Sequence, residues 1–269
     1  MLLCVRWIQP LLALLSSALL TWGAICPPSC LCPDPHTVDC SGRGLTRLPE
    51  PLPLDVRRLL LSNNWIPKIP SDFLVLYSDL VYLDLRNNSI TQIEAGTISP
   101  SSRLVFLDLG SNNLTEIPTG TFGESRSLIK LRLGSNPYLS MVSEDAFLGL
   151  TSLRELELER NALSSLQVGA LSQLPSLKVV RLEGNPWVCD CDFSELFAWL
   201  VENRDKLPNG SAPRLSENSS LCILLQNIPR LHGPHMPWVS GTCHRHHSPF
   251  SSQFGQILMP YVHQLSLVL

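Results

Sequence analysis

The sequence predicts an α/β repeat solenoid with a disulfide cap at each end. Three observations predict it: an eleven-residue pattern recurs six times between residues 56 and 187, eight cysteines form two clusters flanking the pattern, and an apolar leader precedes both. Charged residues make up only 16% of the 269 residues and the formal net charge is −3, with no basic patch in the totals. A nucleic-acid partner is therefore not expected.

The first 23 residues have the arrangement of a signal peptide. Arg6 precedes the apolar run "LLALLSSALL", and the small residues Thr21 and Gly23 follow it. The apolar core is shorter than the roughly 20 residues that a membrane span needs. We therefore expect cleavage near Gly23 and entry into the secretory pathway.

The repeating units are evenly spaced. They begin at Val56, Leu80, Leu104, Leu128, Leu153 and Leu177. The steps are 24, 24, 24, 25 and 24 residues, and each unit fits L-x-x-L-x-L-x-x-N-x-L, the pattern of the leucine-rich repeat. One unit cannot bury its own leucines, so the units must stack. The prediction is a horseshoe of about six repeats, with short parallel strands on its concave face.

Two sets of residues are assigned to the interior of the stack. The ninth position of each unit is an asparagine, whose amide can satisfy buried backbone groups of neighbouring coils. These are Asn64, Asn88, Asn112, Asn136, Asn161 and Asn185. Phe73, Phe122 and Phe147 lie in the return segments and are expected to stack as an aromatic spine.

The cysteines raise three alternatives: metal ligands, a redox pair or disulfides. The C-x-C spacing of Cys189 and Cys191 is too tight for the common zinc sites, and no C-x-x-C accompanies a βαβ unit. An even number of cysteines behind a signal peptide favours a disulfide framework. The histidines at 244, 246 and 247 are expected to belong to a solvated tail, and no metal or other cofactor is predicted.

Both cysteine clusters resemble the caps of extracellular leucine-rich-repeat proteins. "CPPSCLCPDPHTVDC" resembles the amino-terminal cap, and the resemblance implies the pairs Cys26–Cys32 and Cys30–Cys40. "NPWVCDCDFSELFAWL" resembles the start of the carboxy-terminal cap, in which Leu196, Trp199 and Leu200 form a helical apolar face. That resemblance implies two further pairs, Cys189–Cys222 and Cys191–Cys243.

No catalytic constellation is present, so neither an enzyme nor a small-molecule substrate is expected. The chain has no G-x-S-x-G, no H-E-x-x-H and no phosphate-binding glycine loop. Glu155, Glu157 and Glu159 alternate along one strand and share a face. The arginines at 154, 160 and 181 are expected to neutralise them in a solvated, charged surface.

An apolar patch is predicted on the concave face, between the leucines. Its members are Val81, Tyr82, Val105, Phe106 and Ile129. Exposed contiguous apolar surface favours a protein partner, although strands also favour such residues for lateral packing. Both interpretations stay open here.

Glycosylation sequons indicate passage through the secretory pathway. They begin at Asn87, Asn113, Asn209 and Asn218. A glycan on Asn87 would lie near the apolar patch.

Several stretches resemble a narrower group, the leucine-rich-repeat auxiliary gamma subunits of the large-conductance calcium- and voltage-activated potassium channel. They are "PEPLPLDVRRLLLSNN", "YSDLVYLDLRNNSI" and "GNPWVCDCDFSELFAWLVENRDKLPNG". The resemblance covers about residues 26–210. It implies an ectodomain that associates with the pore-forming subunit and shifts activation to less depolarised voltages, at the extracellular side of the plasma membrane.

The chain departs from that group after residue 210. Residues 211–269 contain no run of 18 or more apolar residues, so a membrane span is not expected there. The hypothesis is an auxiliary-subunit ectodomain whose modulation is impaired by the missing helix, and which is secreted or retained. The alternative is a secreted protein that binds an extracellular protein ligand through its concave face.

The expected organisation has five parts. It consists of a signal peptide (1–23), an amino-terminal cap (24–55), six repeats (56–187), a carboxy-terminal cap (188–243, atypical after 210) and a disordered tail (244–269).

Overall fold

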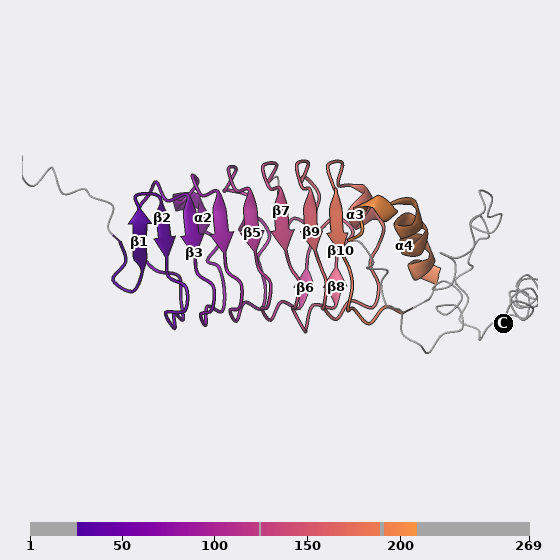
Figure 1. The fold of residues 1–269 in the computed structure, drawn as a ribbon, viewed down its shortest axis with the longest axis horizontal. Helices are drawn as coiled ribbons and strands as arrows, with labels where there is room; N and C mark the ends of the chain where they lie inside the picture. The colour runs from indigo at the N-terminus through magenta and orange to yellow at the C-terminus, as the bar shows by residue number, and fades with distance from the viewer. Residues whose placement is uncertain (1–25, 124, 189–190, 209–269) are drawn as a thin grey trace, which may run out of the picture. The chain divides into compact units, whose positions relative to one another are not determined.

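The repeats form one continuous sheet with one short strand per repeat (Figure 1). The computed structural model describes residues 26–123, 125–188 and 191–208. The strands of this sheet, in chain order, are β1 (Leu31–Asp34), β2 (Thr37–Asp39), β3 (Arg58–Leu60), β4 (Tyr82–Asp84), β5 (Phe106–Asp108), β7 (Lys130–Arg132), β9 (Glu155–Glu157) and β10 (Val179–Arg181). Only β1 runs antiparallel to its neighbour, and the order of strands in the sheet is their order in the chain. The predicted solenoid with short parallel strands is therefore confirmed.

Strand register places equivalent residues of successive repeats side by side. Tyr82 pairs with Phe106, and Phe106 with Lys130. Side chains alternate between the two sides of a strand, so the central residue of each strand points into the stack. These residues are Leu59, Leu83, Leu107, Leu131, Leu156 and Val180, each at most 1% exposed. Their burial forms the core that one repeat cannot make alone.

The asparagines form a hydrogen-bonded ladder along the stack, as the repeat pattern predicts. Asn136 is typical: its Nδ2 donates to the carbonyl of Leu133 at 2.8 Å and to that of Leu109 at 3.3 Å. Its Oδ1 accepts from the backbone N–H of Asn112 at 3.1 Å. All six ladder asparagines are buried. Each buried group left unpaired would cost about 1–3 kcal/mol, so the ladder ties each repeat to the next.

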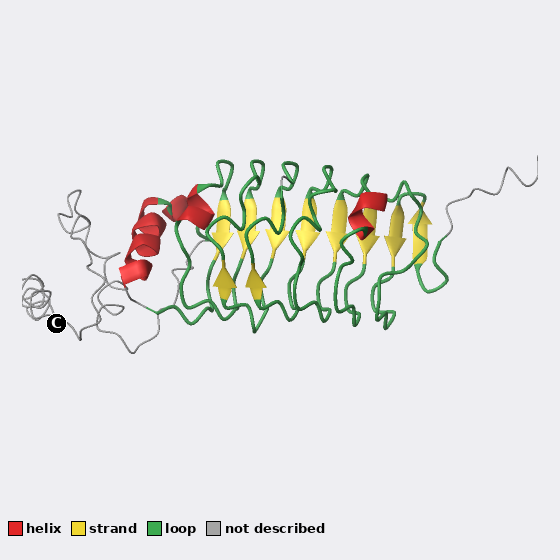
Figure 2. Ribbon diagram, turned by 180° about the vertical axis from the view of Figure 1, so that it is seen from behind, coloured by secondary structure: helices red, strands yellow, loops and turns green. Residues whose placement is uncertain are grey.

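The return segments carry little regular structure (Figure 2). They hold the one-turn helices α2 (Phe73–Leu76) and α3 (Gly169–Ser172). Strands β6 (Glu116–Ile117) and β8 (Met141–Val142) pair in parallel as a second, two-stranded sheet. The leucine pattern gave no signal for this second sheet.

The aromatic spine is shorter than expected. Phe122 and Phe147 stack with ring centroids 5.9 Å apart, but Phe73 contacts Tyr77 in its own repeat at 4.9 Å. The reason is register: Ile98, fully buried, occupies the position equivalent to Phe122 in the preceding repeat. Phe73 lies one residue earlier in its own repeat. The expected three-ring stack is therefore a two-ring stack.

The one 25-residue step is accommodated at Pro137 and Tyr138. Asn112 and Asn136 are 24 residues apart, whereas Leu114 and Leu139 are 25 apart. The backbone N–H of Leu139 donates to the carbonyl of Asn136 at 3.0 Å, closing a turn. Tyr138 is 62% exposed at this turn. The extra residue thus points outward and leaves the register of the main sheet unbroken.

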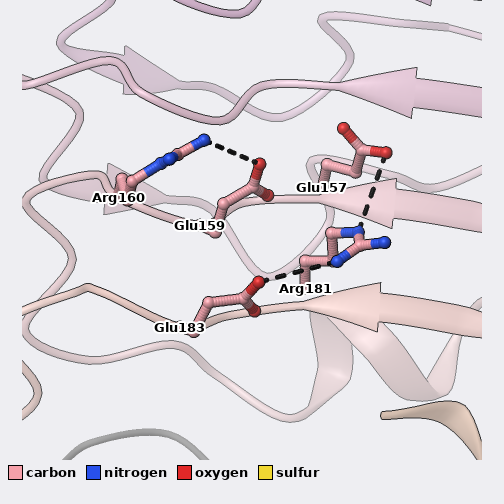
Figure 3. Close-up of a pocket in the computed structure, with 5 residues that line it drawn as sticks. All are labelled: Glu157, Glu159, Arg160, Arg181 and Glu183. Atoms are coloured by element: carbon pink, nitrogen blue, oxygen red, sulfur yellow. Dashed lines mark ion pairs between the residues drawn. The ribbon is translucent and has the colours of Figure 1, made fainter. Parts of the chain in front are cut away.

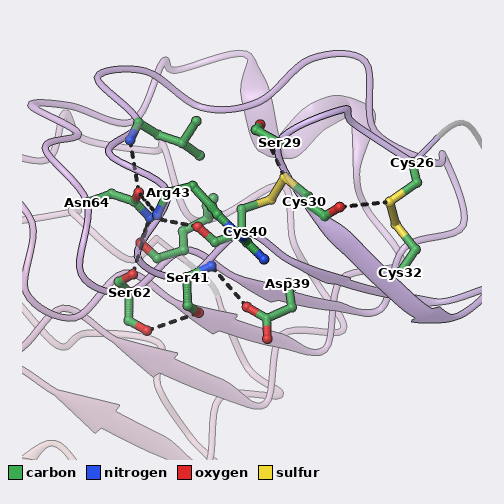
Figure 4. The surroundings of a disulfide bond; sticks show 12 residues. Cys26, Ser29, Cys30, Cys32, Asp39, Cys40, Ser41, Arg43, Ser62 and Asn64 are labelled. Carbon is green, nitrogen blue, oxygen red and sulfur yellow. Dashed lines mark hydrogen bonds between the residues drawn. A yellow bond between two sulfur atoms is a disulfide. The ribbon is translucent and has the colours of Figure 1, made fainter.

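The amino-terminal end is covered by the β1–β2 hairpin and two disulfides (Figure 4). Cys26 is bonded to Cys32 and Cys30 to Cys40, the pairing implied by the resemblance to extracellular caps. The carbonyl of Cys40 also accepts from Nδ2 of Asn64 at 3.0 Å. The cap is therefore joined to the first repeat by the same type of bond that joins the repeats.

The carboxy-terminal end carries α4 (Cys191–Glu202) and a 3-10 turn (Arg204–Lys206). Phe193, Leu196 and Leu200 are buried, so α4 has the predicted apolar face, which also includes Phe193. Trp187 is fully buried and donates its indole N–H to the carbonyl of Leu182 at 3.1 Å. The half-buried Trp199 packs against the same core.

Several predictions fall outside the described residues. The two pairs expected in the carboxy-terminal cap, Cys189–Cys222 and Cys191–Cys243, involve the cysteines at 189, 222 and 243, which are not described. The expected tail lies entirely beyond residue 208. These pairings and the proposed domain boundaries stay predictions. Within the part of the chain that is described, no helix is long and apolar enough to cross a membrane.

Candidate interaction surface

The outward side of the main sheet, called the sheet face, presents side chains in parallel columns. One column runs through Arg58, Tyr82, Phe106, Lys130, Glu155 and Val179. A second lies two residues further along each strand, on the same side, and includes Asp84, Asp108, Arg132, Glu157 and Arg181. A third precedes the strands and runs from Arg57 through Val81, Val105, Ile129 and Arg154 to Lys178.

The middle of the sheet face is apolar and aromatic. Tyr82 and Phe106 stack with centroids 4.2 Å apart and planes 1° from parallel. The Arg58 guanidinium lies 4.6 Å from the Tyr82 ring centroid, and the Arg132 guanidinium 5.4 Å from that of Phe106. Such cation–π contacts contribute about 0.5–1 kcal/mol at exposed sites. Burial is the main cause that raises the pKa of the Tyr82 phenol, so this side chain is neutral at physiological pH.

The five predicted patch residues come together in the structure. Tyr82, Phe106, Val81, Val105 and Ile129 are all half-buried, and we call them the aromatic patch. The Tyr82 and Phe106 rings use their faces for stacking. A ligand would therefore contact the ring edges and the aliphatic side chains of the patch. The stack also supports the alternative interpretation, in which these residues serve lateral packing within the sheet, because neighbouring side chains cover much of each ring.

A network of ion pairs lies beside the patch. Lys130 pairs with Glu155 and lies 3.3 Å from a carboxylate oxygen of Glu157. Arg132 pairs with the same Glu157 at 3.1 Å and with the buried Asp108 at 3.3 Å. The carboxylates of this network are therefore held largely by cations of the preceding repeat.

The prediction that three arginines neutralise the glutamates of this surface is only partly correct. Arg181 and Arg160 take part at the outer limit of ion pairing, 3.9 Å from Glu157 and Glu159 respectively. Arg154 does not: it is exposed, and Glu155 pairs with Lys130 instead. The signal that would have revealed this is column register, because Lys130 and Glu155 occupy equivalent positions in successive repeats.

An acidic hollow of about 390 Å³ opens next to the network (Figure 3). Its lining is Glu157, Glu159, Arg160, Arg181 and Glu183. Glu159 lies over Gly134, where an added Cβ would come within 2.6 Å of its Oε1. Burial, followed by repulsion from Glu157 and Glu183, raises the pKa of the Glu159 carboxyl.

The hollow has no metal-binding arrangement. Across the described ranges, no group of three or more His, Cys, Asp or Glu side chains is placed to hold a metal ion. Arg160 and Arg181 lie within 4 Å of the three carboxylates. The hollow is therefore a charged recess of the surface.

Two sequons can be located. Asn87 is exposed in the turn after β4, with its Nδ2 donating to Oδ1 of Asn63 at 2.8 Å. Asn113 is half-buried. Asn209 and Asn218 lie outside the described residues. Use of all four stays a prediction.

Comparison with known proteins identifies the family. The leucine rich repeat family matches residues 55–114, 102–163 and 126–186, and the leucine rich repeat N-terminal domain matches residues 25–53. The chain is a leucine-rich-repeat protein. Both matching family models describe structural modules, a repeat and its amino-terminal cap, rather than catalytic domains. The amino-terminal cap and its disulfides indicate the secretory pathway.

Among leucine-rich-repeat relatives, mouse leucine-rich repeat-containing protein 38 is 55% identical over 188 residues, 70% of this chain and 63% of that protein. Mouse leucine-rich repeat-containing protein 52 is 42% identical over 74% of this chain and 63% of that protein. Mouse leucine-rich repeat and transmembrane domain-containing protein 1 is 49% identical over 73% of this chain and 56% of its own length. The chain thus spans about 63% of the first two relatives.

A solved structure agrees with the leucine-rich-repeat fold. The TLR13–ssRNA13 complex superposes with a TM-score of 0.52 at 28% identity, covering 60% of this chain and 23% of that one. The RNA belongs to that receptor. For the present chain the likeness supports the stack of repeats.

Proposed function

We propose that the chain is an auxiliary ectodomain that binds the pore-forming subunit of the large-conductance calcium- and voltage-activated potassium channel and modulates its gating. The observation that carries this proposal is the resemblance of three long stretches to the channel's gamma subunits. The 55% identity to leucine-rich repeat-containing protein 38 over 188 residues supports common ancestry over 70% of the chain. A capped, disulfide-bonded stack suits a rigid extracellular partner.

The test is electrical. The 269-residue chain is expressed with the pore subunit, and the voltage of half-activation is measured at fixed calcium. We expect at most a small shift to less depolarised voltages, because the sequence predicts impaired modulation. The same chain carried on an unrelated membrane-spanning helix should shift it further, because tethering raises the effective concentration at the channel. An unchanged curve with both forms, each detected at the cell surface or in the medium, contradicts the proposal.

A second candidate function is favoured by the aromatic patch: capture of an extracellular protein ligand through the sheet face. Stacked aromatic side chains on an exposed sheet are suited to anchor a partner. The labelled chain is applied to cells, and its binding is compared with that of Tyr82→Ser plus Phe106→Ser. We expect the double variant to lose binding while keeping its circular dichroism. Binding that survives the double change refutes the patch as a contact site.

The cellular location of the chain can be tested in the same expression experiments. We propose that the chain acts on the extracellular side of the plasma membrane. The amount of chain in the medium, at the cell surface and inside the cell distinguishes secreted, displayed and retained forms.

A further inference from the structure

The sheet face carries free cations on both sides of its apolar centre. Arg57 and Arg58 are exposed at the amino-terminal side, and Arg154 and Lys178 are exposed at the carboxy-terminal side. Within the described residues, none of these four lies within ion-pair distance of a carboxylate. Arg57, Arg154 and Lys178 are therefore available to a ligand, and Arg58 also contacts the Tyr82 ring.

The carboxylates of the same face are already engaged. Asp108, Glu155 and Glu157 pair with Lys130 and Arg132. Asp84 is half-buried, and its Oδ1 accepts the backbone N–H of Arg86 at 2.9 Å. Nearby, Asp79 pairs with Arg103 at 2.8 Å, and Asp55 lies 3.3 Å from Nδ1 of His36, which carries a charge only when protonated. The unpaired cations left for a partner therefore lie at the two ends of the face, at Arg57, Arg58, Arg154 and Lys178.

The acidic hollow limits where an anionic ligand can lie. Glu159 and Glu183 are at the edge of the sheet where the strands end, whereas Arg57, Arg154 and Lys178 are at the edge where the strands begin. Gly110 and Gly134 hold the positions equivalent to Glu159 in earlier repeats, so the first edge presents no side chain there. An anionic segment is repelled from the first edge and attracted to the second, which fixes its path along the starts of the strands.

We propose that the sheet face binds an extended acidic segment of a protein partner. A central apolar side chain packs on the aromatic patch, and carboxylates on either side pair with Arg57 or Arg58 and with Arg154 or Lys178. Neighbouring strands lie about 4.8 Å apart, so the four strand steps from β3 to β9 span roughly 19 Å, which is about six residues of extended chain. This inference rests on the second candidate function, that the sheet face binds a protein ligand.

A protein segment fits better than a uniformly charged polyanion. The cations are separated by Val81, Val105 and Ile129, which offer nothing to a sulfate or phosphate group. A polyanion would leave this apolar surface uncovered. A peptide that alternates acidic and apolar blocks covers both.

The test uses the full chain and synthetic peptides. The probe peptide has two aspartates at each end and a phenylalanine between them, with the acidic pairs about six residues apart. One control peptide has the same composition with all four aspartates at one end, and another has asparagine in place of aspartate. Binding is measured by fluorescence anisotropy at low and high salt. We expect the probe to bind more tightly than either control, by about tenfold at low salt, and to weaken as salt rises.

Variants of the chain assign the contacts. Arg57→Glu and Arg154→Glu should each weaken probe binding about fivefold, at the upper end of exposed ion pairs. Lys68→Glu makes the same charge change at an exposed residue away from the sheet face and should have almost no effect. A probe with lysines at one end should regain affinity for Arg154→Glu, a result that a merely structural role for Arg154 does not give.

Three results overturn the inference. One is equal affinity for the probe and both control peptides. Another is insensitivity of probe binding to Arg57→Glu and Arg154→Glu. The third is tighter binding of a heparin oligosaccharide that survives Tyr82→Ser plus Phe106→Ser. If the probe peptide does not bind but the double variant still loses binding to cells, only the inference of an acidic segment is refuted. If the double variant also keeps binding to cells, the second candidate function falls with it.

Discussion

At the scale of single residues, Glu157 is the side chain on which the charges of the sheet face converge. It lies within 4 Å of nitrogen atoms of Lys130, Arg132 and Arg181, on both neighbouring strands. Its side chain is 14% exposed. Removing one partner of a nearly buried network leaves the others uncompensated, which costs more than losing an exposed pair. Glu157 therefore serves to hold three repeats together at the edge of the hollow.

Glu159, unlike Glu157, is expected to destabilise the fold when it is ionised, and this gives a prediction about pH. Its pKa is raised above the ordinary value of 4.5, chiefly by burial. The folded state then binds the proton more tightly than the unfolded state, so stability falls as pH rises from the ordinary value through the raised one. Glu159→Gln carries no charge to bury. We expect a higher urea midpoint than wild type at pH 7, and no difference well below pH 4.5.

The control for this change is Glu116→Gln, which removes an exposed carboxylate on β6. It should leave the urea midpoint unchanged at both pH values. A Glu159→Gln chain that is less stable than wild type at pH 7 would show that the pair with Arg160 outweighs the cost of burial.

At the scale of elements, the return segments differ in how they fill the interior. Phe122 and Phe147 occupy equivalent positions and stack, whereas Ile98 and Leu74 fill the same position in earlier repeats with aliphatic side chains. Stacked aromatic pairs contribute about 0.5–1.5 kcal/mol beyond their buried area. The later repeats are thus joined by a contact that the earlier ones lack.

A double-mutant cycle tests this difference. Phe122→Leu and Phe147→Leu should destabilise less together than the sum of the two single changes, by about 0.5–1.5 kcal/mol. Phe73→Leu with Phe122→Leu should be additive within about 0.5 kcal/mol, because Ile98 separates them. The measurement is the free energy of unfolding in urea. Coupling between Phe73 and Phe122 as large as that between Phe122 and Phe147 would restore the three-ring spine.

Most of the strands and their inward side chains could be predicted from the sequence, and the exceptions have physical causes. The strands, inward leucines and ladder asparagines follow from a strict period, because each repeat sees the same surroundings as the last. The length of the aromatic spine did not follow, since a shift of one residue at Phe73 is enough to change its neighbour. The arginines at 154, 160 and 181 were expected to neutralise the three glutamates, whereas the register of the sheet gives Glu155 the cation Lys130 on the preceding strand. The pairing of β6 with β8 rests on two residues per strand, too few to give an alternating pattern.

At the scale of the whole described region, the stack is nearly one-dimensional. Each repeat contacts chiefly the ones before and after it, so stability is roughly a sum of repeats and interfaces. An end without a cover should therefore open first. The two disulfides of the amino-terminal cap differ in burial: Cys40 is fully buried and Cys30 is 9% exposed, while Cys26 and Cys32 are only partly buried.

Removing each disulfide separately should show this gradient. The loops closed are 6 and 10 residues long, so the chain-entropy terms differ by only about half a kcal/mol. We expect Cys30→Ala plus Cys40→Ala to cost about 2–4 kcal/mol and to lower amide protection in β2 and β3 first. Cys26→Ala plus Cys32→Ala is the matched control and should cost less. Equal losses in both, or loss of protection at β10 before β3, would contradict opening from the uncovered end.

The outward turn at Pro137 and Tyr138 has a practical consequence. This turn already holds one residue more than its counterparts, while Lys130 and Glu155 on either side keep their pairing. The neighbouring repeats tolerate that extra length because the surplus backbone protrudes into solvent and leaves the core unchanged. A fluorophore or a short epitope inserted between these two residues would mark the protein on living cells without disturbing its stacked interior.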